Sequence, residues 1–262
     1  MSRPYYHVDA FTDELFAGNP AGVCILSSFS PDKTMQQIAA ENRHSETAFV
    51  VARRDGDFDL RWFTPEVEDD LCGHATLASA YVLGLRQHQN WPVRFHTRSG
   101  VLTVSRDQES FEMDFPARPA QPCEPPADLL PALGLTTAEV MKSRDYLVIV
   151  NDAKQVKALA PDISALSRIE MGIGGTIVTA PGDGDIEYVC RFFAPSLGIA
   201  EDPATGSIHC TLAPYWAGRL GKQRLRAQQL SARGGAMRCT IAADRVKIAG
   251  KARLYLQGTM EL

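Results

Sequence analysis

The 262-residue sequence contains no long hydrophobic run and no excess of positive charge. No window approaches the roughly 18 apolar residues that suggest a membrane-spanning helix, and the N-terminal segment holds no apolar stretch of signal-peptide length. The formal net charge of -4 offers no cationic surface to a phosphate backbone. We therefore expect a cytoplasmic protein that binds neither a membrane nor nucleic acid.

Cysteine-based and nucleotide-binding motifs are also missing. The cysteines are scattered along the chain, at positions Cys24, Cys72, Cys123, Cys190, Cys210 and Cys239. Without C-x-x-C spacing they predict neither a zinc site nor a disulfide scaffold. The segment GIGGTI at 172–177 lacks the last glycine of a dinucleotide loop, and neither a G-x-x-x-x-G-K-[ST] nor a G-x-S-x-G motif occurs. We expect no metal and no cofactor.

One short pattern is present twice. RWFTP stands at 61–65 and RFFAP at 191–195, and each copy is followed by a loop, a glycine and a helix-like run of small and apolar residues. The second loop is three residues longer, so that 73–74 corresponds to 206–207. The shared order of strands, loop, glycine and helix indicates a duplicated structural unit.

A proline-rich segment separates the two copies. PARPAQPCEPPADLLP, at 116–131, has a proline every few residues and suits an extended linker better than a helix or a sheet. We place the domain boundary near 117–127, with one domain at 1–117 and a second at 128–262. In an alternative arrangement, the last strand of the second domain packs on the first.

The duplication suggests where a ligand binds. A helix surrounded by strands presents its N-terminus at one end of its domain, and two domains that face each other would direct both helix starts into one cleft. Each start offers backbone N–H groups, those of Gly73 and His74 in the first domain and of Gly206 and Ser207 in the second. We expect such a cleft to bind a small carboxylate.

Four longer stretches carry a family resemblance. They are VDAFTDELFAGNPAGV (8–23), HSETAFV (44–50), RWFTPEVEDDLCGHATLA (61–78) and RFFAPSLGIAEDPATGS (191–207). They resemble the phenazine-biosynthesis isomerase family, the PhzF-like proteins, across nearly the whole chain. The resemblance implies an α+β fold like that of diaminopimelate epimerase, with two pseudo-symmetric domains, each a mostly antiparallel sheet rolled around a central helix. It also implies a cofactor-independent isomerase that forms a homodimer.

The same resemblance assigns a catalytic role to Glu46. In the isomerase that names the family, the substrate is a dihydro-hydroxyanthranilate, and the glutamate of the S-E-T-A-F motif moves a proton on its ring. Isomerising a conjugated acid requires a base that removes a proton from one carbon and returns it to another. Without this resemblance, the sequence alone favours Glu46 as a surface carboxylate before a strand, and the resemblance reverses that preference.

Further site residues are implied in the same way. His74 and Asp202 would complete the catalytic set, with Ser207 beside them at the substrate. As alternatives, His74 caps or packs the helix start, Asp202 begins an Asp-Pro turn, and Ser207 caps the second helix. Asn19 in GNP is expected to form a turn under the site, and Cys72 to line the pocket.

Two other functions remain open. A racemase or epimerase of the two-thiol type needs facing cysteines, but EDPATG before the second helix contains none, and Cys210 comes after the helix start. A non-catalytic member that binds a small molecule or a protein would keep the scaffold without turnover. The presence of Glu46, His74 and Asp202 together argues against it. The substrate itself does not follow from the sequence.

Overall fold

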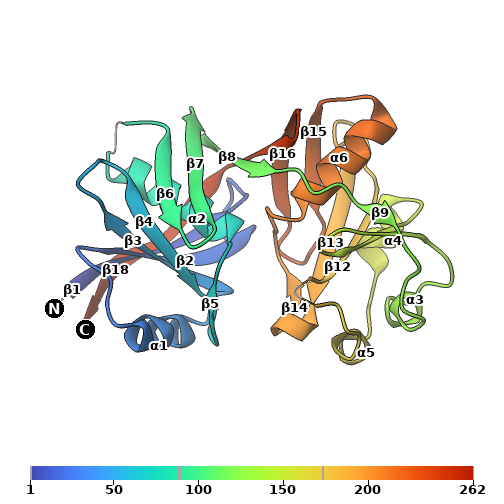
Figure 1. Ribbon diagram of the computed structural model, residues 1–262, viewed down its shortest axis with the longest axis horizontal. Helices are drawn as coiled ribbons and strands as arrows, with labels where there is room; N and C mark the ends of the chain where they lie inside the picture. Colours follow the sequence, from blue (N-terminus) through green and yellow to red (C-terminus); the bar gives the residue numbers. More distant parts are fainter. Residues whose placement is uncertain (1, 88–89, 173, 262) are drawn as a thin grey trace. The chain divides into compact units, whose positions relative to one another are not determined.

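The computed structural model describes residues 2–87, 90–172 and 174–261, which form two units (Figure 1). Met1–Phe115 and Lys247–Leu262 make up unit 1, and Pro116–Val246 makes up unit 2. The longest helix has 13 residues, and no helix of the described part is long and apolar enough to span a membrane.

Unit 1 is a mostly antiparallel sheet around a helix. Its strands are β1 (Ser2–Ala10), β2 (Asn19–Leu26), β3 (Glu46–Ala52), β4 (Phe58–Phe63), β5 (Glu68–Asp69), β6 (Val93–Thr97), β7 (Gly100–Asp107), β8 (Ser110–Pro116) and β18 (Ala252–Glu261). Within unit 1, the pairs β2–β3 and β4–β6 run parallel. Helix α1 (Asp32–Asn42) covers the outside, where Met35 and Ile38 pack against Cys24 and Phe49.

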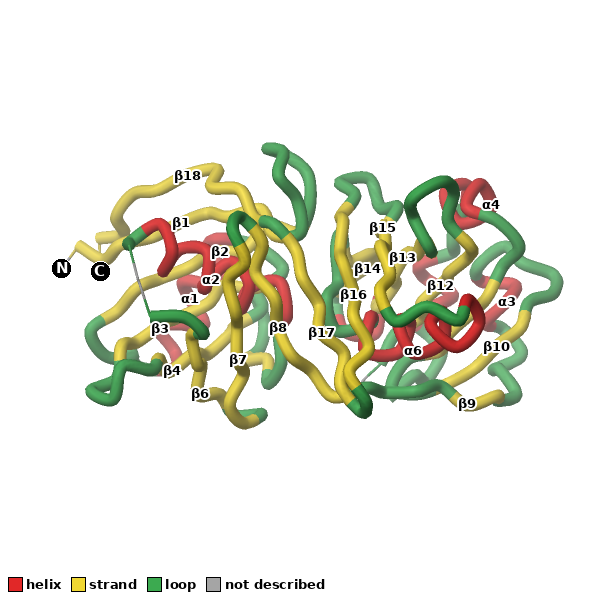
Figure 2. The backbone as a smooth tube through the Cα atoms, turned by 90° about the horizontal axis from the view of Figure 1, so that it is seen from above, coloured by secondary structure: helices red, strands yellow, loops and turns green. Residues whose placement is uncertain are grey.

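Helix α2 (Gly73–Leu85) is the central helix of unit 1, and Figure 2 shows it among the strands. It packs against β1, β2, β3 and β18. Ala and Leu favour the helix, and its small residues allow strands to approach on several sides. The buried hydroxyls of Thr76 and Ser79 donate to the carbonyls of Cys72 and Ala75, at 2.5 and 2.7 Å. Because both are hydrogen-bonded, burying them among apolar residues costs little folding free energy.

Unit 2 has the same arrangement as unit 1, a mostly antiparallel sheet around a helix. Its strands are β9 (Gln121–Pro122), β10 (Glu139–Lys142), β11 (Tyr146–Ile149), β12 (Thr176–Pro181), β13 (Tyr188–Ala194), β14 (Ile199–Asp202), β15 (Arg224–Gln229) and β16 (Gly235–Ala242), and β17 (Arg245–Gly250) begins in this unit. The parallel pairs β11–β12 and β13–β15 match the two of unit 1. The helices are α3 (Leu129–Ala132), α4 (Ala153–Ala158), α5 (Ile163–Ser167), η1 (Pro195–Leu197) and α6 (His209–Leu220).

The repeat extends to side-chain geometry. The guanidinium of Arg61 forms a two-point ion pair with Glu68, at 2.7 and 2.6 Å, and that of Arg191 forms the same pair with Glu201, at 2.7 and 2.8 Å. The second loop, which is three residues longer, begins with the helical turn η1 at Pro195–Leu197. Together with the matched parallel pairs, this confirms the α+β fold with two pseudo-symmetric domains.

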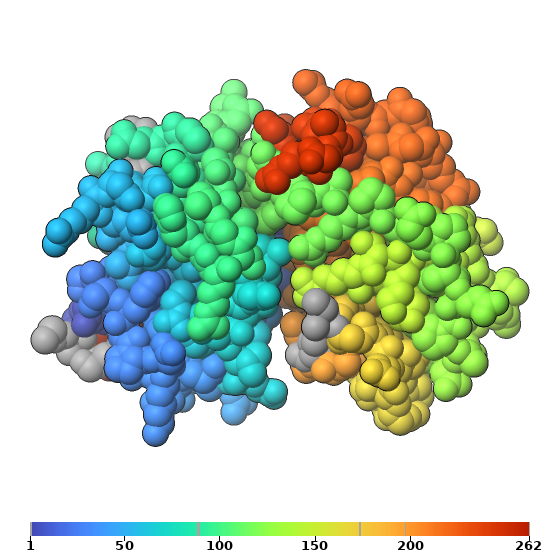
Figure 3. All heavy atoms as spheres, in the orientation of Figure 1, coloured from blue at the N-terminus to red at the C-terminus, as the bar shows by residue number. Residues whose placement is uncertain are grey.

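The proline-rich segment is more than a linker, because its backbone completes α6. Pro214 lies inside α6 and has no N–H to donate to the carbonyl of Cys210 one turn earlier. The N–H of Arg118 donates to that carbonyl instead, at 2.8 Å. In the space-filling view, the green segment lies over one face of unit 2 (Figure 3).

The units therefore differ from the expected domains 1–117 and 128–262 in two places. Residues 116–127 belong to unit 2, and residues 247–262 belong to unit 1. The second difference is the alternative given above, in which the last strand packs on the first domain: β18 pairs with β1 from Ala252 opposite Ala10 to Glu261 opposite Ser2. Backbone hydrogen bonds between distant segments thus determine both boundaries.

Candidate active site

Three of the predicted residues of unit 1 stand at the starts of secondary-structure elements. Asn19 opens β2, Glu46 opens β3 and His74 is the second residue of α2. Because β2 and β3 run parallel, their first residues lie at the same edge of the sheet. All three side chains are buried, with at most 6% of each residue exposed. Their chemistry is thus concentrated at one end of the unit.

His74 is the centre of this cluster. Its Nε2 lies 3.2 Å from Glu46 Oε2, and its Nδ1 lies 3.2 Å from the amide nitrogen of Asn19. Ser45 Oγ lies 3.1 Å from Asn19 Oδ1 and 3.4 Å from His74 Nε2. The thiol of Cys72 lies 3.5 Å from His74 Nδ1. Ser45 did not stand out in the sequence, although it precedes Glu46 in the HSETAFV motif.

The contacts define the tautomer of His74. Burial lowers the pKa of His74 to about 3, so its imidazole is neutral near pH 7, with one donor and one acceptor nitrogen. The amide of Asn19 donates to Nδ1 while its oxygen accepts from the Ser45 hydroxyl. The ring proton then resides on Nε2, where Ser45 Oγ accepts it at 3.4 Å and Glu46 Oε2 lies 3.2 Å away.

The start of α2 adds backbone N–H donors to the cluster. Cys72 at the N-cap makes no side-chain cap hydrogen bond, and the first turn contains no acidic residue. The N–H groups of Gly73 and His74 have no acceptor within their own helix, and the helix dipole makes this end partly positive. The arrangement can bind a carboxylate beside Glu46.

Glu46, Cys72 and His74 could also supply three ligands to a metal, since their ligand atoms lie within 4.8 Å of one another. Carboxylate, thiolate and imidazole are donors that zinc accepts. Here, however, Nε2 of His74 faces Glu46, and Nδ1 accepts from Asn19. Both ring nitrogens are thus used in the hydrogen-bonding network, which must be broken before His74 can bind a metal.

In unit 2, α6 begins at His209, three residues after the expected start at Gly206. Residues 206–208 form a tighter turn, in which the carbonyls of Gly206 and Ser207 accept from the N–H groups of His209 and Cys210 at 3.1 and 3.2 Å. These bonds join residues three apart, which is why the regular helix starts later. Within the described ranges, no hydrogen bond is recorded from the N–H groups of Gly206 and Ser207. They remain available to an anion.

Asp202 ends β14 and is buried, 5% exposed. Its Oδ2 accepts a short hydrogen bond from the hydroxyl of Thr205. The side chain of Gln229 in turn binds the backbone of both residues. Neither Thr205 nor Gln229 was predicted. The repeat could have indicated Thr205, because the match of Gly206 to Gly73 places it opposite Cys72, whereas no sequence signal marks Gln229.

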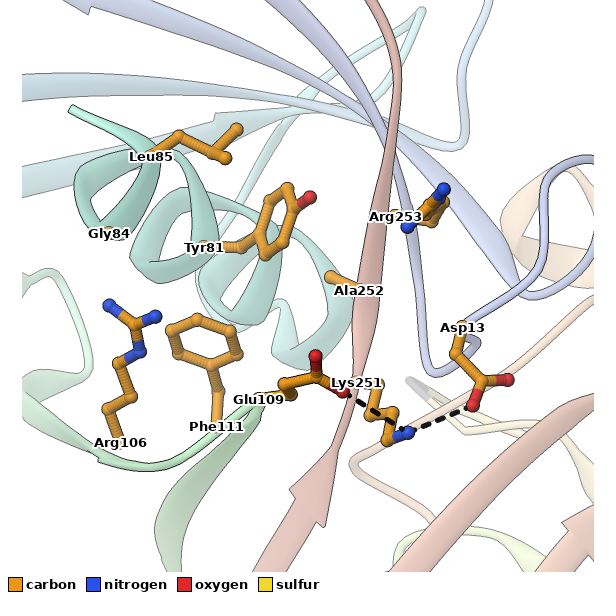
Figure 4. Close-up of a pocket in the computed structure, with 10 residues that line it drawn as sticks. All are labelled: Asp13, Tyr81, Gly84, Leu85, Arg106, Glu109, Phe111, Lys251, Ala252 and Arg253. Atoms are coloured by element: carbon orange, nitrogen blue, oxygen red, sulfur yellow. Dashed lines mark hydrogen bonds and ion pairs between the residues drawn. The ribbon is translucent and has the colours of Figure 1, made fainter. Parts of the chain in front are cut away.

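A hollow at the C-terminal end of α2 is lined by none of the candidate site residues named above. It encloses about 230 Å³ and is lined by Tyr81 and Leu85 of α2 and by charged side chains (Figure 4). Lys251 lies across it, 2.9 Å from Asp13 and 3.6 Å from Glu109. These three side chains are exposed, and such pairs contribute little to stability. The hollow is therefore not part of the candidate site.

A second buried histidine makes folding sensitive to acid. His209 is fully buried, its Nδ1 lies 2.6 Å from the Tyr188 hydroxyl, and its Nε2 has no hydrogen-bond partner within the described ranges. Burial lowers the pKa of both His209 and His74 from 6.5 to about 3. Between these values the unfolded chain binds protons that the folded chain excludes, so stability falls as the pH falls.

We expect His209→Gln to reduce this pH dependence. Below pH 6, each such histidine contributes a slope of at most about 1.4 kcal/mol per pH unit to the free energy of unfolding. Urea unfolding between pH 7.5 and 4.5 should therefore show a shallower loss of stability in the variant. Equal slopes for both proteins would contradict the assignment of His209 as a buried neutral base.

Comparison with known proteins agrees with the sequence motifs. Residues 8–258 match the PhzC-PhzF family, described as phenazine biosynthesis-like protein. A relative from Pseudomonas aeruginosa, named as an uncharacterized isomerase, is 52% identical over 100% of both chains. The crystal structure of a PhzF-family phenazine biosynthesis protein from Enterococcus faecalis has a TM-score of 0.96 and 43% identity over 100% of both chains. A probable proline racemase from Agrobacterium radiobacter shares the fold alone, with a TM-score of 0.62 and 11% identity over 99% of this chain and 93% of the racemase. The chain therefore belongs to the PhzC-PhzF family of phenazine biosynthesis-like proteins.

Proposed function

We propose that the protein is a cofactor-independent isomerase of a small carboxylate-bearing metabolite, in which Glu46 moves a proton within the substrate. The isomerase class follows from the family and from relatives that are named isomerases. The observation that carries the proposal is the buried carboxylate of Glu46, whose Oε2 lies 3.2 Å from Nε2 of a neutral His74. This environment suits a group that accepts and returns a proton out of contact with bulk water.

The reaction balances without an electron acceptor. Glu46 removes a proton from a saturated carbon, and the electron pair of the broken C–H bond moves into the conjugated system of the substrate. The protonated Glu46 then returns the proton to another carbon of that system. N–H groups at the start of α2, those of Gly73 and His74, stabilise the negative charge that develops on the substrate carboxylate. The net change is the position of one hydrogen and of the double bond.

In this proposal unit 2 supplies the rest of the site. The N–H groups of Gly206 and Ser207 bind anionic oxygen atoms of the substrate, and Asp202 accepts hydrogen bonds from its hydroxyl or amino groups. The two units would then share one cleft, and the substrate would be bound between them. A carboxylate, a conjugated double bond and a hydrogen-bond donor define the class of substrate.

A one-base mechanism fits the asymmetry of the repeat better than a two-thiol mechanism. Strand registers place Thr47 opposite Phe63 and Thr176 opposite Phe193, so the position in unit 2 that corresponds to Glu46 is Gly175. The residue that corresponds to Cys72 is a threonine. Only one unit carries the proton-transferring carboxylate, and no second cysteine is available at the matching position. A racemase of the two-thiol type is the weaker alternative.

The proposal is tested by incubating the protein with a metabolite extract in deuterium oxide. An isomerase should convert one metabolite into an isomer with a new retention time, or introduce deuterium at carbon. Either change should require Glu46 and should survive in Glu66→Gln, since Glu66 is exposed. A metabolite that stabilises the protein without either change would indicate binding without turnover, and would contradict the isomerase proposal.

We also propose that the protein is a homodimer, because the family suggests one and twofold pairs are the commonest oligomers. Light scattering at micromolar concentration and physiological salt should give twice the chain mass of 28.7 kDa. A monomer mass under these conditions would contradict the proposal.

A further inference from the structure

Gln229 is fully buried at the end of β15, and its amide group contacts the turn that follows Asp202. Its Oε1 accepts from the N–H of Thr205 at 2.8 Å, and its Nε2 donates to the carbonyl of Asp202 at 2.6 Å. A backbone N–H only donates and a carbonyl only accepts. The amide oxygen of Gln229 therefore faces the N–H of Thr205, and its amide nitrogen faces the carbonyl of Asp202. One side chain thereby holds both ends of the turn.

The same amide also orients the hydroxyl of Thr205. Nε2 of Gln229 lies 3.3 Å from Thr205 Oγ1 and acts as its donor. The single hydrogen of that hydroxyl is then free to donate to Asp202 Oδ2, where the short contact occurs. A chain of oriented hydrogen bonds runs from Gln229 through Thr205 to the carboxylate of Asp202.

Unit 1 shows that the fold itself does not need this arrangement. Asp69 corresponds to Asp202, because Glu68 and Glu201 occupy the same place in the two arginine pairs. Its carboxylate accepts from the N–H groups of Asp70 and Leu71, at 2.7 and 3.3 Å, within its own turn. Among the described residues, a glutamine support of this kind is recorded at Asp202, the carboxylate to which we assign a role in substrate binding, whereas the recorded acceptor bonds of Asp69 lie within its own turn.

We propose that Gln229 is a positioning residue, which holds the Asp202 carboxylate and the Thr205 hydroxyl in the orientation that the substrate requires. This inference rests on the proposed function. Gln229 acts through Asp202 and Thr205 and does not itself contact the substrate. Polar groups of the substrate, a hydroxyl or an amine, are the partners that a rigidly held carboxylate selects.

The test compares two isosteric changes on adjacent residues. Gln229→Met removes both amide groups at nearly constant volume, and Gln228→Met makes the same change at an exposed neighbour. In Gln229→Met, the amide hydrogen of Thr205 should exchange at least about tenfold faster, because it has lost its acceptor. Turnover in the deuterium oxide assay should fall by at least about tenfold. Gln228→Met should change neither quantity.

Gln229→Glu adds a readout that general loss of stability does not give. The carboxylate can still accept from the N–H of Thr205, but it cannot donate to the carbonyl of Asp202 until it is protonated. Turnover relative to wild type should therefore recover as the pH is lowered, and melting temperatures measured alongside identify any unfolded sample. If the ratio of variant to wild-type turnover does not change with pH, the role of the Gln229 side chain as donor to the carbonyl of Asp202 is contradicted.

The outcomes separate this inference from the proposed function. Faster Thr205 exchange with wild-type turnover in Gln229→Met would overturn the positioning role while the isomerase proposal stands. Unchanged Thr205 exchange would overturn the hydrogen-bonding basis of the inference. If wild-type protein neither isomerises nor deuterates any metabolite, the proposed function fails, and the positioning role fails with it.

Discussion

Glu46→Gln should abolish proton transfer and leave ligand affinity within about tenfold of wild type. The substitution keeps the size of the side chain, replaces one accepting oxygen with a donating NH2 group, and removes the ability to take up a proton. Since the lost interaction belongs to the transition state, kcat and kcat/KM should fall together. A fall of at least about 10³-fold is expected when the single base of a proton transfer is removed. The measurement is isomer formation or deuterium incorporation with the metabolite found in the screen.

Glu66→Gln provides the matched control, because it makes the same change at an exposed position of unit 1. Its turnover should equal that of wild type. Binding is followed separately, as the shift in melting temperature that the metabolite produces. Wild-type turnover by Glu46→Gln would eliminate Glu46 as the base, whereas loss of binding in this variant would show that its carboxylate acts mainly in substrate affinity.

Asn19→Asp should reverse the tautomer of His74 and lower turnover by roughly 10²-fold or more. The new carboxylate can only accept, so Nδ1 of His74 must carry the proton that Nε2 carries in the wild-type protein. The Nε2 atom, which lies 3.2 Å from Glu46 Oε2 and 3.4 Å from Ser45 Oγ, then carries no proton. A histidine held in the wrong tautomer is a known route to losses of this size or larger in other enzymes.

Nitrogen NMR of the His74 side chain tests this prediction without a substrate, because protonated and unprotonated ring nitrogens have distinct shifts. The wild-type protein should show the proton on Nε2 and the variant should show it on Nδ1. Asn151→Asp, at an exposed position, should alter neither the spectrum nor the rate. A variant with the wild-type tautomer, or with the reversed tautomer and full activity, would contradict the proposed role of Asn19.

The duplicated fold could be predicted because both copies keep residues with a local purpose. The arginines of RWFTP and RFFAP recur because each binds a glutamate on the strand that follows. The small residues of α2 recur in part because each central helix is packed by strands. Of the domain boundaries, the sequence suggested the packing of the last strand on the first domain only as an alternative, and it did not suggest that residues 116–127 belong to unit 2. Both boundaries depend on contacts between segments far apart in the chain. One contact is the pairing of β18 with β1, and the other is the hydrogen bond from the N–H of Arg118 to the carbonyl of Cys210, which Pro214 leaves without its helical donor.

For the candidate site, local motifs identified the groups that can do chemistry, such as Glu46 before a strand and His74 at a helix start. The residues that orient them come from elsewhere in the sequence. Asn19 lies 55 positions from His74, and Gln229 lies 24 positions from Thr205. Asn19 stood out only as a turn former in GNP, whereas the structure makes it the first residue of β2, and no pattern in the sequence indicates Gln229.

The amino-acid sequence alone was thus sufficient to identify the family, the duplication and the class of reaction. It also identified Glu46, His74 and Asp202 as candidate site residues. The folded arrangement alone revealed the neutral state of His74, the direction of its proton, and the support of Asp202 by Gln229. The physical reason is that hydrogen-bond direction and the removal of water depend on which side chains meet in space. These meetings arise from strand pairing and helix packing over long separations, which short motifs do not encode.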